Sequence, residues 1–296
     1  MHKKINFVEF YITNVCNIAC DGCNRFNNLK LTGHDNWTEH LASYENFAKS
    51  VDVTGFVNIL GGEPLMHPKI NTILSDLRRI FPDKGIRICT NGLLLHKIKG
   101  FWNSVVENKI MLDISIHNSS WRKNIYETLC SLTGEKVKLK WNLQPNSRMA
   151  EFLHKEVKHA IHLSDRFYQN AFGDPYAKNL KPYDSDPEEA HRGCDFRHKS
   201  HGIETHSPTI MNGRLFKCPM ANSMPIAIRQ RNDIEYSEKQ KDLIDTFPYF
   251  ECSELHNITT DDFNTLMYDT IPQCSLCPVR YDDQAISDQQ ISRNLF

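Results

Sequence analysis

Short apolar runs alternate with helical stripes through the first half of this 296-residue chain. This alternation is what most constrains its fold. Strand-like runs lie near residues 5–12, 56–60, 86–90, 110–116 and 136–143, with a weaker run near 161–168. Between the second and third runs, Ile70, Ile73, Leu74 and Leu77 recur at the i, i+3, i+4 spacing of an amphipathic helix. Such alternation predicts parallel βα units, with functional side chains gathered where the strands end.

Three cysteines follow the first apolar run in a Cys-x3-Cys-x2-Cys pattern: Cys16, Cys20 and Cys23. Three thiolates this close can hold three corners of a four-iron cluster and leave the fourth iron open. An open iron can bind and activate a cofactor, whereas an iron cluster with four protein ligands mainly passes electrons. A structural zinc site needs four ligands, usually in two close pairs. The spacing therefore favours an iron–sulfur cluster.

A second motif, Gly61-Gly62-Glu63-Pro64, follows the second strand-like run. Glycine has no Cβ, so two glycines at a strand end let a ligand approach the backbone closely. The carboxylate of Glu63 suits an amino group. The motif is expected to act together with the cysteine triplet, because it comes one βα unit later.

With these two motifs, the chain resembles radical S-adenosylmethionine (SAM) enzymes over about residues 5 to 180. The resemblance implies that Cys16, Cys20 and Cys23 carry a [4Fe–4S] cluster and that the segment 61–64 contacts the amino group of SAM. One electron then cleaves the sulfonium, and a 5′-deoxyadenosyl radical takes a hydrogen atom from the substrate. The residue before the third cysteine, often aromatic in the family, is Gly22 here, so adenine recognition must come from elsewhere. The six strand-like runs then predict an α/β fold, a partial (β/α)6 barrel spanning residues 1–180.

Later strand ends supply further candidates. By resemblance, Thr90, Asn91 and Ser115 are expected to contact the methionine carboxylate or the ribose. His117, which follows the fourth run, is a further candidate for contact with SAM or substrate. The alternatives are that Asn91 merely belongs to a turn with Gly92 and that His117 is a structural strand-end residue. Trp141 and Asn142, at the end of the fifth run, are predicted to bind substrate, with packing as the alternative for Trp141.

The C-terminal third, residues 181–296, is predicted to be a small α+β domain that follows a Pro- and Asp-rich linker at about 172–193. Asn212-Gly213 suits the type I′ turn of a hairpin. Four cysteines of this region, in an order that resembles the short one-cluster "twitch" domain, are predicted to hold a second [4Fe–4S] cluster: Cys194, Cys218, Cys274 and Cys277. Structural zinc remains an alternative, because four cysteines can also close a tetrahedral site.

Three cysteines lie outside both patterns. Cys89, which ends the third run, and Cys130, on a helical segment, are expected to be buried packing residues. Cys252 is open to three interpretations: a packing residue, a substitute cluster ligand or a catalytic hydrogen-atom donor.

Composition and charge limit the classes of partner and the cellular compartment that the sequence favours. A net charge of −1 and a pI near 6.9 give no basic field for nucleic acid, and 40% hydrophobic residues suffice for a sizeable core. The N-terminus lacks a signal-peptide pattern, and no apolar window is long enough to cross a membrane. Ten cysteines with metal-like spacing then favour a reducing, cytoplasmic setting.

These features predict a radical SAM enzyme that oxidises a small polar metabolite, such as a sugar, cyclitol or nucleotide. A flavodoxin- or ferredoxin-type protein is the expected electron donor. The short architecture resembles the butirosin-pathway dehydrogenase and the neomycin-pathway epimerase. Two alternatives stay open: an epimerase in which Cys252 returns a hydrogen atom, and a peptide- or protein-modifying maturase.

Overall fold

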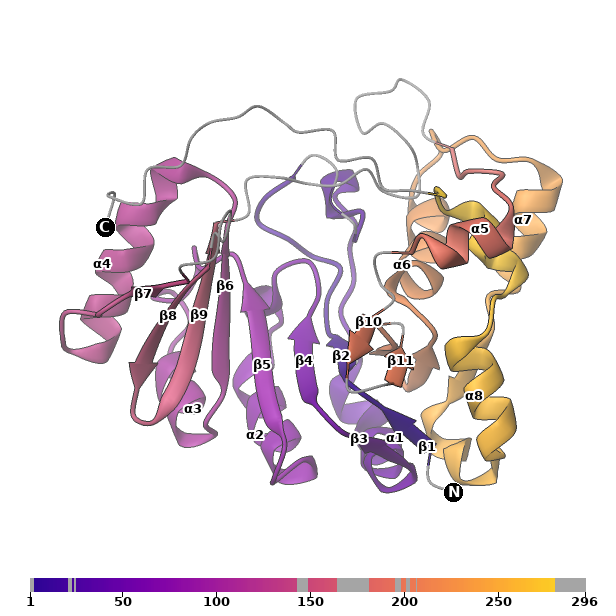
Figure 1. Ribbon diagram of the computed structural model, residues 1–296. Helices are drawn as coiled ribbons and strands as arrows, with labels where there is room; N and C mark the ends of the chain where they lie inside the picture. The colour runs from indigo at the N-terminus through magenta and orange to yellow at the C-terminus, as the bar shows by residue number, and fades with distance from the viewer. Residues whose placement is uncertain are drawn as a thin grey trace.

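The computed structural model describes residues 3–20, 23, 25–142, 149–163, 181–194, 198–200, 203–205 and 207–279. Its main feature is one large mixed sheet (Figure 1). The strands of this sheet are β2 (Val8–Tyr11), β4 (Phe56–Leu60), β5 (Gly85–Thr90), β6 (Met111–Ile116), β7 (Lys140–Trp141), β8 (Met149–His154), β9 (Val157–Leu163), β12 (Thr209–Met211), β13 (Arg214–Phe216) and β14 (Tyr249–Glu251). They lie in the order β14-β13-β12-β2-β4-β5-β6-β9-β8-β7. This α/β architecture with a partial-barrel sheet is the predicted fold class.

The parallel centre of the sheet is built from βα units. Strands β2, β4, β5 and β6 are mutually parallel. Helices α1 (Trp37–Ser50), α2 (Ile70–Ile80), α3 (Phe101–Glu107) and α4 (Arg122–Thr133) each follow one of these strands, and Figure 1 shows them placed along the sheet in chain order. The predicted apolar stripe of α2 is at most 2% exposed and packs into the main core. The helical spacing and the strand-like runs therefore predicted the helices and strands of this part of the chain correctly.

The end of the sheet beyond β6 differs from the expected parallel units. Strand β9 is parallel to β6, but β8 is antiparallel to β9, and β7 is antiparallel to β8. Only Lys155 and Glu156 separate β8 from β9, too few residues for a crossover helix. Both have positive φ, 45° and 67°, as a type I′ turn requires, although neither is a residue typical of that turn. The expected strand over 136–143 shortens to Lys140–Trp141.

The C-terminal strands extend the same sheet on its other side. Strand β12 is parallel to β2, β13 pairs with β12, and β14 pairs with β13. Asn212 and Gly213 have φ values of 48° and 74°, so the predicted type I′ hairpin is confirmed. The boundary at residue 180 stays a prediction, because residues 164–180 lie outside the described part.

The remaining helices are α5 (Pro187–Arg192), α6 (Pro219–Gln230), α7 (Glu238–Asp245) and α8 (Thr260–Tyr268), with 3-10 turns η1 (Asn27–Leu29), η2 (Pro64–Met66), η3 (Ser119–Trp121), η4 (Cys252–Asn257) and η5 (Pro272–Leu276). Two small sheets pair β1 (Lys3–Ile5) with β3 (Val51–Val53) and β10 (His198–Ser200) with β11 (Ile203–Thr205). Helix α8 adds Phe263, Leu266 and Met267 to the main core.

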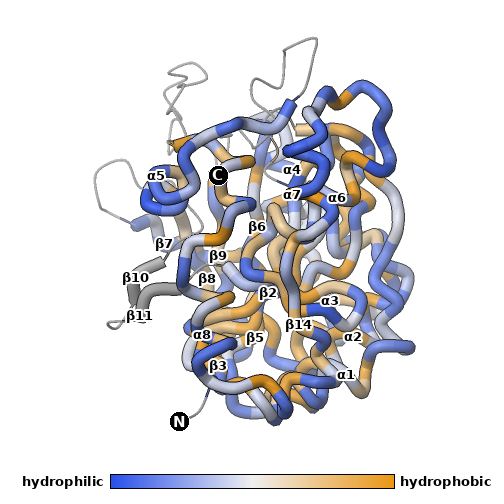
Figure 2. Tube along the Cα trace, turned by 90° about the vertical axis from the view of Figure 1, so that its right-hand side faces the viewer, coloured by the Kyte–Doolittle hydropathy of each residue, from blue (hydrophilic) through white to orange (hydrophobic). Residues whose placement is uncertain are grey.

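A second apolar core joins the segment after the cysteine triplet to the C-terminal region. Phe26, Leu29 and Leu31 pack there with residues of α6 such as Met220 and Met224. In Figure 2 orange is concentrated at strands such as β3 and β5, whereas the outer helices α5 and α7 are largely blue. The described helices include none that is long and apolar enough to cross a membrane.

Candidate functional site

The cysteine triplet lies in the loop that leads from β2 to η1. Cys16, Cys20 and Cys23 are all half-buried. The amide of Cys23 donates to the carbonyl of Cys20 at 3.2 Å, and Phe26 donates in turn to the carbonyl of Cys23 at 2.9 Å. The loop is thus folded by its own backbone around the last two cysteines. Gly22 lies outside the described residues.

The two glycines of the 61–64 segment bring two pieces of backbone together. The amide of Gly62 donates to the carbonyl of Thr13 at 2.7 Å, and that of Glu63 donates to Val15 at 2.8 Å. A Cβ on Gly61 would meet the Thr13 oxygen at 2.6 Å, and one on Gly62 would meet the Val15 oxygen at 2.4 Å. The close neighbour is therefore the chain leading into the cysteine triplet, where the sequence reasoning expected a ligand.

Glu63 is the buried acid of this site, with 1% of its surface exposed. Its carboxylate accepts hydrogen bonds from the Thr90 hydroxyl at 2.7 Å, the Asn91 amide at 2.8 Å and the Leu65 amide at 3.1 Å. Burial raises the pKa of this carboxyl to about 7, although all three hydrogen bonds favour the charged form. A buried acid of this kind is favourably ionised once a cation binds beside it.

Asn91 ties the third strand end to the cysteine loop. Its side-chain amide donates to Asn17, between Cys16 and Cys20, at 2.8 Å, and its side-chain oxygen accepts from the amide of Leu93 at 3.0 Å. Burial raises the pKa of Cys16 to about 11, and the Glu63 carboxylate adds to this rise. Three neighbouring strand ends of the sheet therefore meet at the loop that carries the triplet. Iron binding would have to displace the Cys16 proton.

The other predicted contacts are placed as follows. Ser115 lies on β6, and His117 lies just beyond that strand; both are half-buried. Trp141 packs against the main core, which matches the packing alternative. The amide of Asn142 donates to the carbonyl of Met149 at 3.0 Å, which continues the pairing of β7 with β8. Their roles toward SAM and substrate stay predictions.

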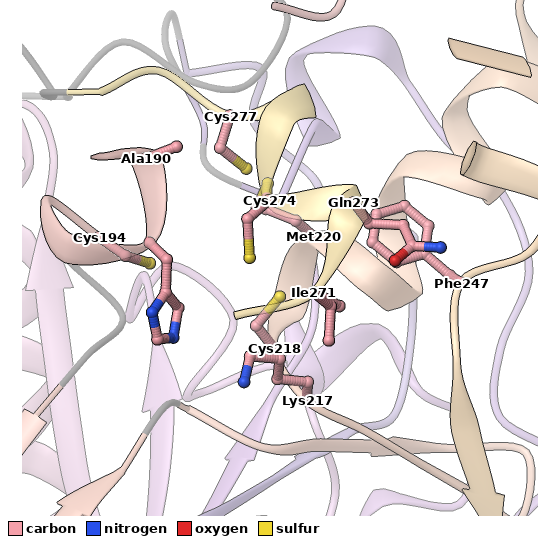
Figure 3. A pocket seen from close by; sticks show the side chains of 11 residues that line it. Ala190, Cys194, Lys217, Cys218, Met220, Phe247, Ile271, Gln273, Cys274 and Cys277 are labelled. Carbon is pink, nitrogen blue, oxygen red and sulfur yellow. The ribbon is translucent and has the colours of Figure 1, made fainter. Parts of the chain in front are cut away.

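The four C-terminal cysteines line one pocket with an empty volume of about 440 Å³. Figure 3 shows the thiols of Cys194, Cys218, Cys274 and Cys277 around this shared space. Cys194 follows α5, Cys218 is the N-cap of α6, and the last pair belongs to the η5 turn. The sequence order thus brings together cysteines that are up to 83 residues apart (277 − 194).

This pocket also holds a buried cation that the sequence reasoning missed. Lys217 is 1% exposed and donates to the carbonyls of Leu266 at 3.0 Å and Asp269 at 2.6 Å. Burial lowers its pKa, and the neighbouring thiols of Cys274 and Cys218 oppose that shift. Burying a charge costs several kcal/mol, roughly, unless an opposite charge compensates it. The donor set of four thiols beside a buried ammonium therefore fits an anionic thiolate-bound metal group.

The thiols are not drawn together around a single ion. Throughout the described ranges, no three Cys, His, Asp or Glu side chains are arranged as they are around one bound metal ion. One zinc ion holds its thiolates at about 2.3 Å and so brings them close together. A four-iron group spaces its ligands farther apart.

Cys252 lies in the main hydrophobic core and has no exposed surface. Its amide donates to Gly213 at 2.7 Å, and its carbonyl accepts the side-chain amide of Asn46, on α1. Burial raises the pKa of its thiol far above the ordinary value. Its position is that of a packing residue, and a role as hydrogen donor gains no support from it.

Comparisons with known proteins point to one superfamily. The family model "Radical SAM superfamily" matches residues 10–129. Two proteins named GTP 3′,8-cyclase are similar over part of their length. The one from Moorella thermoacetica is 28% identical over 95 residues, 31% of this chain and 29% of that one. The one from Petrotoga mobilis is 31% identical over 100 residues, 32% of this chain and 30% of that one. The chain thus spans less than a third of these relatives.

Two solved structures align with part of this chain. BtrN in complex with AdoMet and 2-DOIA aligns with 43% of this chain and 52% of its own, at 20% identity and a TM-score of 0.36. Streptococcus suis SuiB bound to S-adenosylmethionine aligns with 43% of this chain and 30% of its own, at 19% identity and a TM-score of 0.33. The family match covers Cys16, Cys20, Cys23, the 61–64 segment and Asn91, so residues 10–129 of this chain resemble the radical SAM superfamily.

Proposed function

We propose that this protein is a radical SAM oxidoreductase that dehydrogenates a small polar metabolite, such as a sugar, cyclitol or nucleotide. The observation that carries the proposal is the convergence of three strand ends. Cys16 follows β2, Glu63 follows β4, and Asn91 follows β5, joined by the hydrogen bond from Asn91 to Asn17. Bound at a [4Fe–4S] cluster, SAM supplies on one-electron reduction a 5′-deoxyadenosyl radical that abstracts hydrogen.

The residues of this site have separate tasks. The thiols of Cys16, Cys20 and Cys23 would hold the cluster, and the deeply buried carboxylate of Glu63 would accept the ammonium of SAM. Thr90 and the Asn91 amide fix that carboxylate from the next strand. These residues come from one rigid sheet, so the cofactor would be oriented without rearrangement of the fold.

The C-terminal pocket supports oxidation in preference to other outcomes. An alcohol that has lost a hydrogen atom must lose a further electron and a proton to become a ketone, so an electron acceptor is required. Four thiols beside the buried Lys217 suit a second iron–sulfur cluster for that purpose. The alternative of a peptide- or protein-modifying maturase would use the same residues, whereas the alternative of an epimerase lacks an accessible thiol at Cys252.

Anaerobic reconstitution with iron, sulfide and SAM tests the proposal. Dithionite-reduced wild type should release 5′-deoxyadenosine, and a small-molecule extract of the source organism should yield a product lighter by two hydrogens. The Cys16→Ala, Cys20→Ala, Cys23→Ala triple variant should release none. Cys130→Ala, which removes a half-buried thiol on α4, is the matched control and should behave as wild type. Release by the triple variant would overturn the assignment.

The electron donor is proposed to be a flavodoxin- or ferredoxin-type protein. Such donors deliver single electrons at low potential, as reductive cleavage of SAM requires. Replacing dithionite with a reduced flavodoxin and its reductase should sustain 5′-deoxyadenosine formation. Failure of both flavodoxin and ferredoxin, with dithionite still effective, would count against this class of partner.

A further inference from the structure

The central sheet carries a row of polar side chains on one face. Residues such as Ile59, Ile88 and Ile114 point toward α1–α4 and belong to the main core. Because side chains alternate along a strand, their neighbours point to the opposite face. This inner face contains Glu9, Asn58, Arg87, Cys89, Asp113, Ser115 and His162, and strand pairing places Asn58 beside Arg87, Cys89 beside Asp113, and Ser115 beside His162.

Three of these side chains form a connected chain across β5, β6 and β9. Arg87 Nη1 lies 3.1 Å from Asp113 Oδ2, and His162 Nε2 lies 2.9 Å from Asp113 Oδ1. Arg87 is fixed in turn by donating from Nε to Asn58 at 3.0 Å. The Asp113 side chain is 10% exposed, whereas that of His162 is 37% exposed. A buried carboxylate therefore lies between a cation and an accessible imidazole.

This arrangement distinguishes the two ring nitrogens. Asp113 faces Nε2 at 2.9 Å, so we expect a neutral His162 to carry its proton on Nε2 and to present Nδ1 as the acceptor. Asp113 also pairs with Arg87, and its carboxylate would stabilise the imidazolium that forms when Nδ1 takes a proton. A histidine with only a structural role would be expected to be buried, as His159 is. His159 is 2% exposed, stacked on Phe152 on the helix-packed face.

The position of His162 along β9 fits a role as proton acceptor. Ala160 is the β9 residue paired with Asp113, and His162 lies two residues further, beside Ser115. His162 is therefore one pleat nearer than Asp113 to the carboxyl ends of the strands. Those ends carry Cys16, Glu63 and Asn91, so the imidazole lies on the side of the sheet toward the proposed SAM site.

We propose that His162 is a catalytic base that accepts the proton of a substrate hydroxyl on the inner face, with Asp113 as its positioning residue. This inference rests on the proposed function. In the dehydrogenation, a SAM-derived radical would take the carbon-bound hydrogen atom, and the proposed second cluster held by the C-terminal cysteines would accept one electron. The O–H bond breaks, its proton forms the Nδ1–H bond of His162, and its electron pair stays on oxygen and enters the C=O bond. The substrate class is thus a hydroxylated small molecule.

Replacement of the ring and chemical rescue test the base. His162→Gly should form product about 100-fold more slowly or worse, since a general base contributes roughly 10²–10⁴-fold. It should still cleave SAM reductively without substrate. Added imidazole should restore product formation, and the weaker base 1,2,4-triazole should restore much less. Equal rescue by both, or an undiminished rate, would mean that the ring only fills space.

His154→Gln is the matched control. His154 faces Glu135 Oε1 at 3.5 Å, but on the helix-packed face of the sheet, so its loss should leave the rate of product formation unchanged. If wild type forms no 5′-deoxyadenosine, the proposed function itself fails. The role of His162 fails separately, if wild type forms product and His162→Gly forms it at the same rate. An equal loss in His154→Gln and His162→Gly would indicate damage to the sheet and overturn the assignment.

A spectroscopic measurement stands without any substrate. Long-range ¹H–¹⁵N spectra of histidine-labelled full-length protein report which ring nitrogen carries the proton, and His162→Gln assigns the signal. Neutral His162 should be protonated on Nε2, and Asp113→Asn should shift the ring toward the Nδ1–H form. A wild-type ring protonated on Nδ1, or an unchanged ring in Asp113→Asn, would overturn the proposal.

Discussion

At the scale of single residues, the carboxylate of Glu63 is both hydrogen-bonded and deeply buried. Its carboxylate receives three hydrogen bonds within the protein, yet burial still raises its pKa to about 7. The hydrogen bonds alone do not offset the loss of water around the charge. A cation placed beside the carboxylate would supply the missing stabilisation, which is what the ammonium of SAM offers.

Glu63→Gln should therefore weaken SAM binding by about 10-fold or more, since a hydrogen bond to a charged group contributes roughly 1.5–3 kcal/mol. Equilibrium dialysis of the reconstituted protein with labelled SAM measures the change, and thermal unfolding checks that the fold persists. Glu107→Gln, an exposed glutamate at the end of α3, is the control. Unchanged affinity in Glu63→Gln would remove Glu63 from the cofactor site.

The positive charge of Lys217 should raise the reduction potential of a cluster bound in the C-terminal pocket. A buried positive charge favours the reduced, more negative form of a neighbouring cluster. Lys217→Met should lower the reduction potential by on the order of 50–100 mV, as expected for one charge at close range with an effective dielectric near 20. A redox titration followed by electron paramagnetic resonance measures it, with the exposed Lys239→Met as control. A pocket that binds zinc would give no such signal.

At the scale of elements, the junction of β2 and β4 depends on the absence of side chains. A Cβ on Gly62 would meet the Val15 carbonyl at 2.4 Å, so the two strand ends would have to separate. Gly62→Ala should therefore reduce iron incorporation at the triplet as well as stability. Gly134→Ala, at the end of α4, adds backbone strain of about 1–2 kcal/mol but meets no neighbour, so it should keep its iron. Iron content and unfolding midpoint distinguish the two variants.

The β8–β9 hairpin carries an acid-sensitive group. His159 accepts a hydrogen bond from the Leu112 amide at 3.0 Å, and burial lowers its pKa to about 4. Because the unfolded chain takes up this proton near pH 6.5, stability should fall as pH decreases from about 6.5 to 4, by up to about 3 kcal/mol. His159→Gln should flatten the dependence of the urea midpoint between pH 7 and 5. The exposed His96→Gln should not.

The sequence predicted those elements whose signals lie within a few consecutive residues. Helix α2 and the Asn212–Gly213 hairpin were predicted from spacing and turn chemistry, and the structure confirms both. The β8–β9 hairpin was missed because its turn, Lys155–Glu156, lacks the usual residues, and strain there is balanced by pairing with β6. Lys217 was missed because its partners, Leu266 and Asp269, lie about 50 positions away in the chain.

At the scale of the whole molecule, two cysteine sites share one sheet. The segment after the triplet packs on α6, whose N-cap is Cys218. Between them, Arg25 pairs with Glu9 of β2 at 2.7 Å, and its charge lowers the pKa of Cys218 against a larger rise from burial. The second site is thus anchored to the first strand of the barrel. The proposed second cluster would therefore share one scaffold with the first.

The two sites should nevertheless be separable by mutation. Two four-iron clusters predict about eight iron and eight sulfide per chain, and the Cys16, Cys20, Cys23 triple variant should keep about four. Cys274→Ser with Cys277→Ser removes two ligands from the η5 turn and leaves the β2 loop intact, so it should also keep about four iron and still release 5′-deoxyadenosine. It should not oxidise substrate, because the electron acceptor is gone. If the triple variant retained zinc, or if the double variant oxidised substrate at the wild-type rate, the C-terminal site would be structural.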